Sequence, residues 1–340
     1  MKVDLFDYHL PKENIAQHPE EKRDHSKLLV VNKSNDTVKH RHFYDILDEL
    51  TANDVLVMNN TKVIPARLIG EKTDTKAVIE VLLLKELEKN TWEALTKPAK
   101  KVKIGTVVSF GNGVLKMECI DIKDEGIRVY KAIYEGIFLE VLEHLGTMPL
   151  PPYITEKLED QNRYQTVYAL NPGSAAAPTA GLHFTKELIE KIKEKGVEIV
   201  EVTLHVGLGT FRPVQVDEIL DHQMHYESYE ITKEASEKLN YFKSINKNII
   251  AVGTTSVRTL EANYNNGFHE GFYSTNIFIY PGYQFKVVDS IITNFHLPKS
   301  TLMMLISAFY DREKILKIYE EAINLHYRFF SFGDSMFIKR

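Results

Sequence analysis

The sequence feature that most constrains the fold is a run of five short strand-like segments with no helical pattern between them. The segments cover residues 78–84, 91–96, 107–110, 115–122 and 127–134. Asn112 and Gly113 separate two of them, and both residue types tolerate the positive φ angles of a tight turn. Closely spaced strands without intervening helices predict a small all-β module.

A boundary lies on each side of this module. The pattern changes near Gly70. On the C-terminal side of the module the chain is stiffened by three prolines, Pro149, Pro151 and Pro152, because each proline fixes φ and removes a backbone donor. A chain of 340 residues also exceeds the roughly 100–200 residues of a usual domain, so two domains are expected. The predicted divisions are residues 1–69, 70–149 and 150–340.

The rest of the chain has a mixed α/β pattern. Apolar runs that are typical of buried strands cover residues 28–31, 55–58, 63–69, 197–206, 248–252, 275–280 and 287–292. Helical spacing covers residues 185–195, 232–245, 257–264, 301–308 and 312–327. Thr185 is the expected cap of the first helix and Gly196 its stop. We therefore predict an α/β main domain.

Composition excludes several classes of protein. Cys119 is the only cysteine, so neither an intrachain disulfide nor a cysteine-based zinc site can form. The N-terminus lacks the basic start and apolar run of a signal peptide, and no segment approaches the ~20 apolar residues that span a bilayer. These features predict a soluble cytoplasmic protein, with a monomer as the default.

The formal net charge of −5 argues mildly against binding of nucleic acid along a whole basic face. A local patch is available, because Lys97, Lys100, Lys101 and Lys103 lie within seven residues of one another. For a short lysine run, however, a solvated loop is the more common interpretation.

Five loops in the second half combine glycine, hydroxyl and imidazole groups, most of them at ends of predicted strands. They lie at residues 171–184, 205–211, 221–227, 253–258 and 293–298. Each loop taken alone is also compatible with a simple turn or helix cap. Together they indicate an enzyme, because scaffolds carry their functional groups on loops at strand ends.

Two of these loops have a recognisable chemistry. His183 lies directly before a helix start, where backbone amides and the helix dipole favour anionic or carbonyl groups. Residues 205–211 begin like a dinucleotide fingerprint, but Arg212 replaces the last glycine and Pro213 blocks an immediate helix. A Rossmann nucleotide site is therefore disfavoured.

Metal binding is an alternative for the histidines. His222, His225 and Glu227 lie close together, and His205 could join them as a ligand. The spacing is not diagnostic, since no H-E-x-x-H pattern is present. In the next loop Arg258, one turn into a helix, has the planar fork that binds a carboxylate or a phosphate.

Nearly the whole chain resembles one family. The matching stretches are FDYHLP at 6–11, IAQ at 15–17, DVLVMN at 54–59, VIPARL at 63–68, RYQTVY at 163–168, residues 176–185 and 202–211, His225, GTTSVRTL at 253–260, and residues 277–282, 293–301 and 327–334. These stretches resemble the S-adenosylmethionine:tRNA ribosyltransferase-isomerases of queuosine biosynthesis. The departures are Lys62 for an arginine, Ala175 for a branched apolar residue and Phe332 for a tyrosine.

The resemblance implies both a reaction and a fold. S-adenosylmethionine would donate its ribosyl unit to the aminomethyl arm of a 7-deazaguanine at the tRNA wobble position. Adenine and methionine would leave, and epoxyqueuosine would form. The fold implied is a barrel-like main α/β domain with an inserted small β-barrel domain, without a metal or a permanently bound cofactor.

A base of near-neutral pKa suits this reaction, because the sulfonium acidifies the C5′ hydrogens of the donor. The candidate catalytic residues are His183, His205, His225 and His296. Our hypothesis is that His183 or His205 acts as the base and that Arg258 or Glu227 anchors the amino-acid end of the donor. The resemblance further implies substrate contacts from Arg67, Ser174, Thr179, Gly181, Phe184, Gly207, Gly209, Thr210, Thr254, Thr255, Tyr280, Asn294, Phe295, Arg328 and Asp334.

For the tRNA we expect a local cationic surface formed by Arg67, Arg163 and the four lysines of the 97–103 patch. Two other functions fit parts of the sequence. A metal-dependent hydrolase would use His205, His222 and His225 as ligands. A non-catalytic RNA-binding protein would rely on the lysine patch and the β module.

Overall fold

Two groups of strands organise the computed structural model, which describes residues 1–156, 158–207 and 214–340. The chain divides into two units, and each is described by itself. Unit 1 comprises Met1–Thr61, Pro152–Asn171 and Pro178–Arg340. Unit 2 comprises Lys62–Pro151 and Pro172–Ala177.

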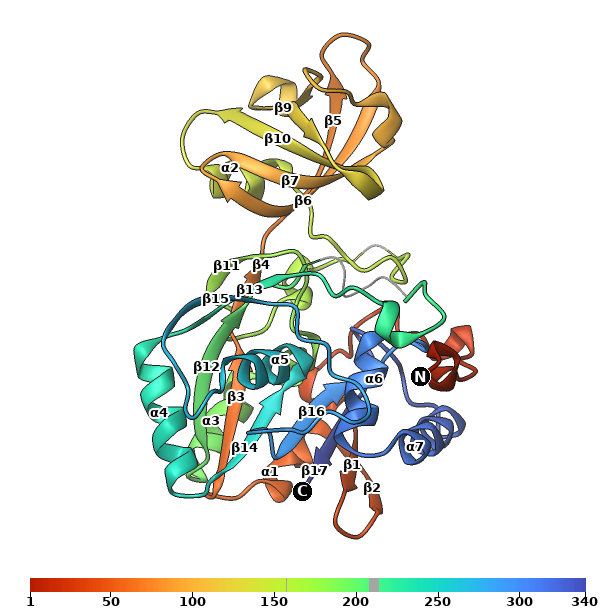
Figure 1. The fold of residues 1–340 in the computed structure, drawn as a ribbon, viewed down its shortest axis with the longest axis vertical. Helices are drawn as coiled ribbons and strands as arrows, with labels where there is room; N and C mark the ends of the chain where they lie inside the picture. Colours follow the sequence, from red (N-terminus) through yellow and green to blue (C-terminus); the bar gives the residue numbers. More distant parts are fainter. Residues whose placement is uncertain (157, 208–213) are drawn as a thin grey trace. The chain divides into compact units, whose positions relative to one another are not determined.

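Unit 1 contains a nine-stranded mixed sheet (Figure 1). Its order is β15 (Gly271–Thr275), β13 (Glu227–Ile231), β12 (Glu198–Leu204), β3 (Asp54–Asn59), β14 (Asn248–Val252), β16 (Ser290–Asn294), β17 (Ser335–Lys339), β1 (Lys27–Asn32) and β2 (Thr37–His42). The central strands β12, β3, β14 and β16 run parallel to one another, whereas the outer neighbours β13 and β17 are antiparallel to β12 and β16. Every residue of β3 and β16 is buried, as expected for strands covered on both faces.

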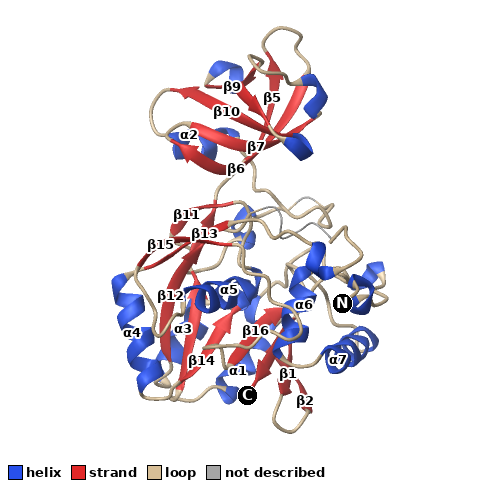
Figure 2. Cartoon of the chain, viewed as in Figure 1, coloured by secondary structure: helices blue, strands red, loops and turns tan. Residues whose placement is uncertain are grey.

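The helices described in unit 1 are α1 (Ile46–Glu49), α3 (Lys186–Glu194), α4 (Lys233–Ser244), α5 (Gly253–Asn263), α6 (Thr301–Phe309) and α7 (Arg312–Asn324) (Figure 2). Four of these six, α3, α4, α6 and α7, begin after a residue whose side chain caps the first turn. The Thr185 hydroxyl accepts the backbone N–H of Leu188, and Gly196 ends this helix region at φ +85°, as predicted. No helix within the described ranges is long and apolar enough to cross a membrane.

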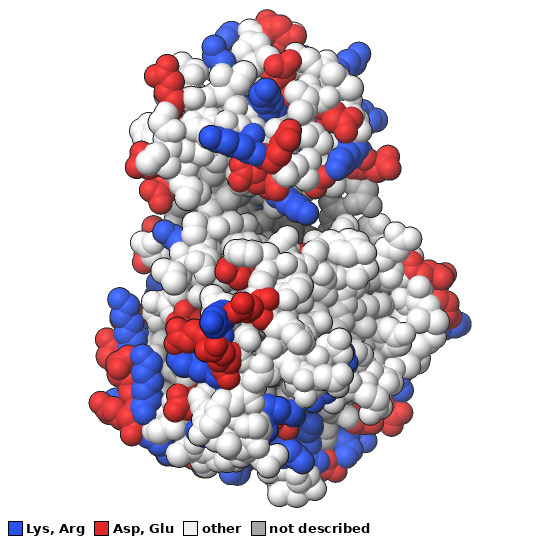
Figure 3. All heavy atoms as spheres, turned by 60° about the vertical axis from the view of Figure 1, so that its left-hand side comes forward, with Lys and Arg blue, Asp and Glu red and all other residues white. Residues whose placement is uncertain are grey.

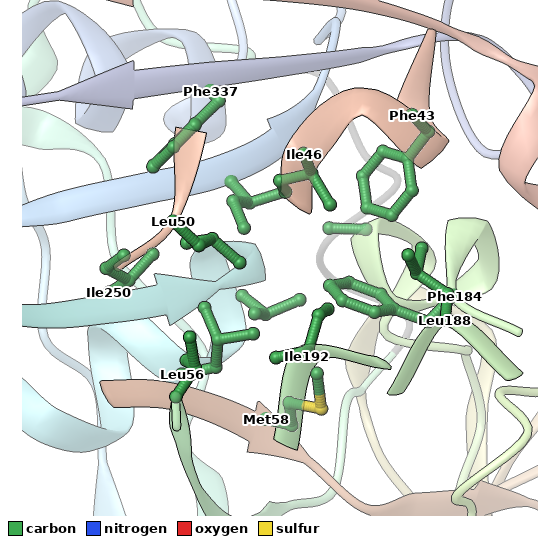
Figure 4. Packing of buried hydrophobic residues seen from close by; sticks show 14 of the residues in the cluster. Phe43, Ile46, Leu50, Leu56, Met58, Phe184, Leu188, Ile192, Ile250 and Phe337 are labelled. Carbon is green, nitrogen blue, oxygen red and sulfur yellow. The ribbon is translucent and has the colours of Figure 1, made fainter. Parts of the chain in front are cut away.

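A hydrophobic cluster fixes α1 and α3 to the sheet (Figure 4). Ile46 of α1 and Ile192 of α3 are fully buried with Leu56 of β3 and Ile250 of β14. Each such side chain contributes about 1.5–3 kcal/mol through burial. This packing holds the central strands in place, so the loops at their ends stand on a rigid base.

Unit 2 contains a closed barrel of six antiparallel strands. The order is β10 (Ile127–Tyr134), β7 (Thr91–Lys97), β6 (Val78–Glu88), β5 (Arg67–Lys72), β8 (Val107–Phe110) and β9 (Leu115–Ile122), and α2 (Phe138–Leu145) follows. Asn112 and Gly113 have φ angles of 55° and 100°, as expected for the tight turn. The predicted α/β class with a small β-barrel is confirmed. The sheet of unit 2 closes into a barrel. The nine described strands of unit 1, where a barrel-like domain was expected, form a sheet with two edge strands, β15 and β2.

Local differences from the predicted elements have physical causes. The predicted strand at residues 63–69 is divided into β4 (Thr61–Val63), which pairs with β11 (Asn171–Ser174), and β5, because Pro65 lies between them. The predicted strand at 275–280 is wrong, since β15 ends at Thr275. The polar edge strand β2 was missed because its sequence has no apolar alternation.

Candidate functional site

The central parallel strands of unit 1 end at a common edge of the sheet (Figure 1). Residues 205–207 follow β12 at that edge, α5 begins there directly after β14, and residues 295–298 follow β16. Ligands of α/β proteins bind outside the carboxyl ends of such strands. The structure therefore gathers described parts of three of the five segments singled out in the sequence.

Glu227 of β13 and Arg258 of α5 form an ion pair in which each residue is only 5% exposed. Beside them is a hollow of about 380 Å³ that is partly open to solvent. Its other lining residues are Gly207, His222, Met224, His225, Thr301 and Leu302. We call this hollow the Arg258 pocket. It unites residues from two loops, β13, α5 and α6.

Arg258 has hydrogen-bonding capacity to spare. Its Nη1 atom donates to Glu227, whereas Nε and Nη2 are buried and have no hydrogen-bond partner within the described part of the chain. Nε–H and Nη2–H lie on one edge of the guanidinium and form the fork that binds a carboxylate. A buried donor without an acceptor costs about 1–3 kcal/mol, so a ligand carboxylate at this edge would be strongly favoured.

His205 lies at the end of β12, opposite the start of β13. Its backbone N–H donates to Ser228, the neighbour of Glu227, and its Nδ1 atom is 2.8 Å from the Thr61 hydroxyl. Either atom of this pair can be the donor. In the tautomer whose Nδ1 donates to Thr61, Nε2 is the acceptor nitrogen, and it has no hydrogen-bond partner in the described ranges. Burial lowers the pKa of His205, so its ring is neutral at pH 7.

His183 is held by both ring nitrogens. Nδ1 is 2.7 Å from the Ser26 hydroxyl, and Nε2 accepts from the Asn294 amide at 3.0 Å. The amide oxygen of Asn294 in turn accepts from the Thr179 hydroxyl at 2.8 Å. Burial, reinforced by the charges of Arg328 and Arg23, lowers the pKa of His183 to about 3. The ring is a neutral hydrogen-bonding link between two loops.

His296 is also buried and neutral. Its Nε2 atom is 2.8 Å from the Thr293 hydroxyl, and its backbone N–H donates to the Tyr319 hydroxyl. Burial lowers the pKa of His296 to about 3. The adjacent Phe295 is fully buried, and its ring packs on Tyr319 and Phe329. Both side chains thus belong to the core beneath the loop.

The histidines of the hydrolase alternative are not gathered around one point. His222 is half-buried with its ring 5.5 Å from that of Phe278, and His225 is exposed. Burial and the charge of His225 lower the pKa of His222. Among the described residues, no three His, Cys, Asp or Glu side chains are arranged to hold a metal ion.

A protein-family model described as "Queuosine biosynthesis protein" matches residues 3–338. The chain belongs to this family. A Clostridioides difficile relative named S-adenosylmethionine:tRNA ribosyltransferase-isomerase is 57% identical, and the match covers 100% of both chains. A crystal structure of an S-adenosylmethionine tRNA ribosyltransferase from Thermotoga maritima is 38% identical and aligns over 98% of this chain and 99% of that one, with a TM-score of 0.56.

Several small residues implied by the family resemblance lie at the same sheet edge. Gly181 has no room for a side chain, because an added Cβ would lie 2.0 Å from the Tyr168 hydroxyl. Gly253 turns the chain from β14 directly into α5 at φ +86°. Thr254 and Thr255 follow it and are buried, and the Thr255 hydroxyl has no hydrogen-bond partner within the described ranges.

Other implied residues have visible structural roles. Phe184 is in the hydrophobic cluster, and Tyr280 packs its ring on Phe278. Asp334 is 1% exposed and accepts the backbone N–H groups of Lys27 and Arg328, at 2.8 and 2.7 Å. Gly209 and Thr210 lie outside the described residues.

The remaining candidates are in unit 2. Arg67 is 3.7 Å from the Glu80 carboxylate, and the Ser174 hydroxyl donates to the carbonyl of Ala176. Lys97 is exposed, and Lys100, Lys101 and Lys103 line a groove that also contains Lys72. Figure 3 shows basic and acidic side chains interspersed over the visible face of this unit. On this face the basic side chains form no continuous cationic surface.

Sequence reasoning missed the buried carboxylate of Glu261 on α5. Its Oε1 atom accepts the backbone N–H groups of Val287 and Val288, and its Oε2 atom accepts that of Lys286 and the Tyr283 hydroxyl, all at 2.9–3.1 Å. Glu261 thereby ties the loop at 283–288 to the helix that carries Arg258. The signal was a glutamate on the apolar face of a predicted helix.

The two buried histidines predict a pH-dependent stability. Unfolded histidines titrate near pH 6.5, whereas His183 and His296 stay neutral in the fold down to about pH 3. Because the unfolded state binds the protons first, stability is complete above pH 6.5 and falls as the pH drops toward 3. We expect a loss on the order of a few kcal/mol between pH 7 and pH 5, measured by urea unfolding. In a His183→Gln/His296→Gln variant the profile should be flatter, and an equal slope in both proteins would contradict the assignment.

Proposed function

We propose that this chain is an S-adenosylmethionine:tRNA ribosyltransferase-isomerase. It transfers and isomerises the ribosyl moiety of S-adenosylmethionine onto 7-aminomethyl-7-deazaguanine at the tRNA wobble position, gives epoxyqueuosine, and releases adenine and methionine. The observation that carries the proposal is the unpaired fork edge of Arg258 beside Glu227. The donor has a free amino-acid end, and this pair offers a cation for its carboxylate and an anion for its ammonium.

We assign the general base to His205. It removes a C5′ proton next to the sulfonium, and the electron pair left on C5′ forms a C4′–C5′ double bond as the C4′–O4′ bond breaks. The freed O4′ forms a carbonyl at C1′ as the bond to adenine breaks, and adenine leaves with a proton. The amine of the tRNA base then adds to C4′ and loses a proton, the carbanion formed at C5′ attacks C1′, and the C1′ alkoxide closes the epoxide at C5′ as methionine leaves. The free Nε2 atom and the neutral ring support this role. We assign His183 to positioning, since hydrogen bonds occupy both of its ring nitrogens. We assign His296 to positioning as well, since it is buried in the core beneath its loop, and place His225 at the pocket rim.

The tRNA is the second substrate. We propose that its phosphates contact Arg67, Arg163 and the patch of Lys97, Lys100, Lys101 and Lys103, which gives salt-dependent binding. The enzyme acts in the cytoplasm as a monomer, with S-adenosylmethionine as co-substrate and no metal or bound cofactor.

The decisive experiment is release of adenine. Purified protein is mixed with S-adenosylmethionine and tRNA that carries 7-aminomethyl-7-deazaguanine, and the products are separated by chromatography. We expect one adenine for each modified tRNA, and none when guanine occupies the wobble position. Unchanged substrates would refute the enzyme, and activity that a chelator abolishes would favour the hydrolase alternative.

A His205→Gln variant should lose the base while keeping a hydrogen bond to Thr61. We expect the single-turnover rate of adenine release to fall 10²- to 10⁴-fold, with donor affinity within a few-fold of the parent. The matched control is His269→Gln, which changes an exposed histidine and should leave the rate unaltered. A rate within a few-fold of the parent in His205→Gln would move the base to another residue.

A further inference from the structure

Three arginines that are distant in sequence converge on one pocket of unit 1, separate from the Arg258 pocket. The pocket has a volume of about 270 Å³, and its lining includes Glu20, Arg23, Arg163, His183 and Arg328. All three arginines are half-buried. Guanidinium groups repel one another, and burial together with the charge of Arg163 lowers the pKa of Arg23. Such an arrangement persists where an anion is to be bound.

Backbone carbonyl oxygens, rather than acids, hold two of these arginines. Arg23 donates to the carbonyls of Leu182 and Asn162 at 3.1 and 3.0 Å. Arg163 donates to the carbonyl of Glu21 at 3.1 Å, and its Nε atom is buried without a partner in the described ranges. Carbonyl oxygens orient the guanidinium groups, but because they carry no formal charge they do not neutralise the positive charge of the arginines.

The acids near the pocket are unevenly placed. The Glu20 carboxylate is 2.9 Å from Arg328. Asp334 lies 3.9 Å from Arg328, but backbone N–H groups already occupy both of its oxygens. The charge of Asp160 acts on Arg23, yet no carboxylate of the described residues comes within 4.0 Å of Arg23 or Arg163. These two guanidinium groups therefore have no direct anionic partner in partly buried surroundings, where screening by water is weak.

We propose that this pocket binds a backbone phosphodiester of the tRNA, with Arg23 as a contact residue in addition to Arg163 and Arg328. The proposal rests on the proposed function, because S-adenosylmethionine contains no phosphate and its one carboxylate is served by Arg258. Phosphate oxygens accept from several forked guanidinium groups at once. Through His183, the pocket wall is hydrogen-bonded to Asn294 at the end of β16, so a phosphate bound here anchors the RNA next to the strand-end loops.

The test uses the full chain and a fluorescently labelled anticodon stem-loop with 7-aminomethyl-7-deazaguanine at the wobble position. In Arg23→Gln and Arg163→Gln, we expect the RNA to bind about tenfold more weakly, and the slope of log Kd against log salt to fall by about one. Donor affinity should be unchanged. Arg340→Gln removes the same charge from a side chain that is 72% exposed, and it should bind RNA like the parent.

Three outcomes would overturn the proposal. If the variants melt like the parent and keep its RNA affinity and salt slope, the pocket is outside the RNA footprint. If they lose donor affinity instead, the pocket serves the donor carboxylate. If inorganic phosphate raises the melting temperature of the parent but not of Arg23→Gln, while RNA affinity is unchanged, the ligand is free phosphate. Should Arg23→Gln fail to fold, Arg23→Lys is measured in the same way. A parent that binds RNA through these arginines yet releases no adenine would refute the proposed function and leave the phosphate site standing.

Discussion

An Arg258→Lys variant should need on the order of 100-fold more S-adenosylmethionine for half-maximal rate. Lysine keeps the positive charge that compensates the buried Glu227 carboxylate, so the fold is expected to survive. It lacks the edge formed by Nε–H and Nη2–H, which is the part of Arg258 that has no partner in the described structure. Equilibrium binding of labelled donor and the dependence of adenine release on donor concentration measure the effect.

Two further variants sharpen this prediction. Arg340→Lys makes the same exchange at an exposed arginine and should leave donor affinity unchanged. Glu227→Gln should weaken binding of the donor more than binding of an analogue that lacks the α-amino group, because the carboxylate is assigned to the ammonium. Donor affinity equal to the parent in a folded Arg258→Lys protein would place the amino-acid end elsewhere.

Replacement of Glu261 by alanine should destabilise unit 1 by on the order of 4 kcal/mol. The side chain is fully buried, and its loss would leave the N–H groups of Lys286, Val287 and Val288 without an acceptor. Each unsatisfied buried donor costs about 1–3 kcal/mol. Urea unfolding followed by circular dichroism measures the loss.

Glu190→Ala is the matched control, since Glu190 is an exposed glutamate on α3, and it should change stability by less than about 0.5 kcal/mol. The loss of stability in Glu261→Gln should lie between the losses in Glu261→Ala and Glu190→Ala. An amide keeps one acceptor oxygen and turns the other position into a donor. If Glu261→Ala unfolds at the urea concentration of the parent, the loop at 283–288 does not depend on this carboxylate.

Much of the fold was predictable where local chemistry decides. The cap at Thr185, the stop at Gly196 and the turn at Asn112 and Gly113 all occur as expected. Short-range hydrogen bonds and φ preferences determine these features. The strands that the sequence did not predict depend on long-range contacts instead. The strand β2 is a polar edge strand, and β13 and β17 form by pairing with strands that are distant in sequence.

The candidate site shows the same division. Residue types and loop positions alone identify Glu227, Arg258 and His205 as candidates. The sequence could not decide between His183 and His205 as the general base. A histidine before a helix start gives the same sequence pattern whether its two ring nitrogens are free or hydrogen-bonded. That difference depends on Ser26 and Asn294, which lie 157 and 111 residues away along the chain.

The sequence alone determined the class of the fold, the separate β module and the family resemblance, because hydrophobic periodicity, capping and motif order are properties of the chain itself. Only the tertiary structure decided which charges are compensated. It pairs Arg258 with Glu227 while leaving one edge of the guanidinium open, and it brings Arg23, Arg163 and Arg328 to one pocket with few acids. The physical reason is that burial and through-space distance set the energy of a charge, and neither is a function of separation along the chain.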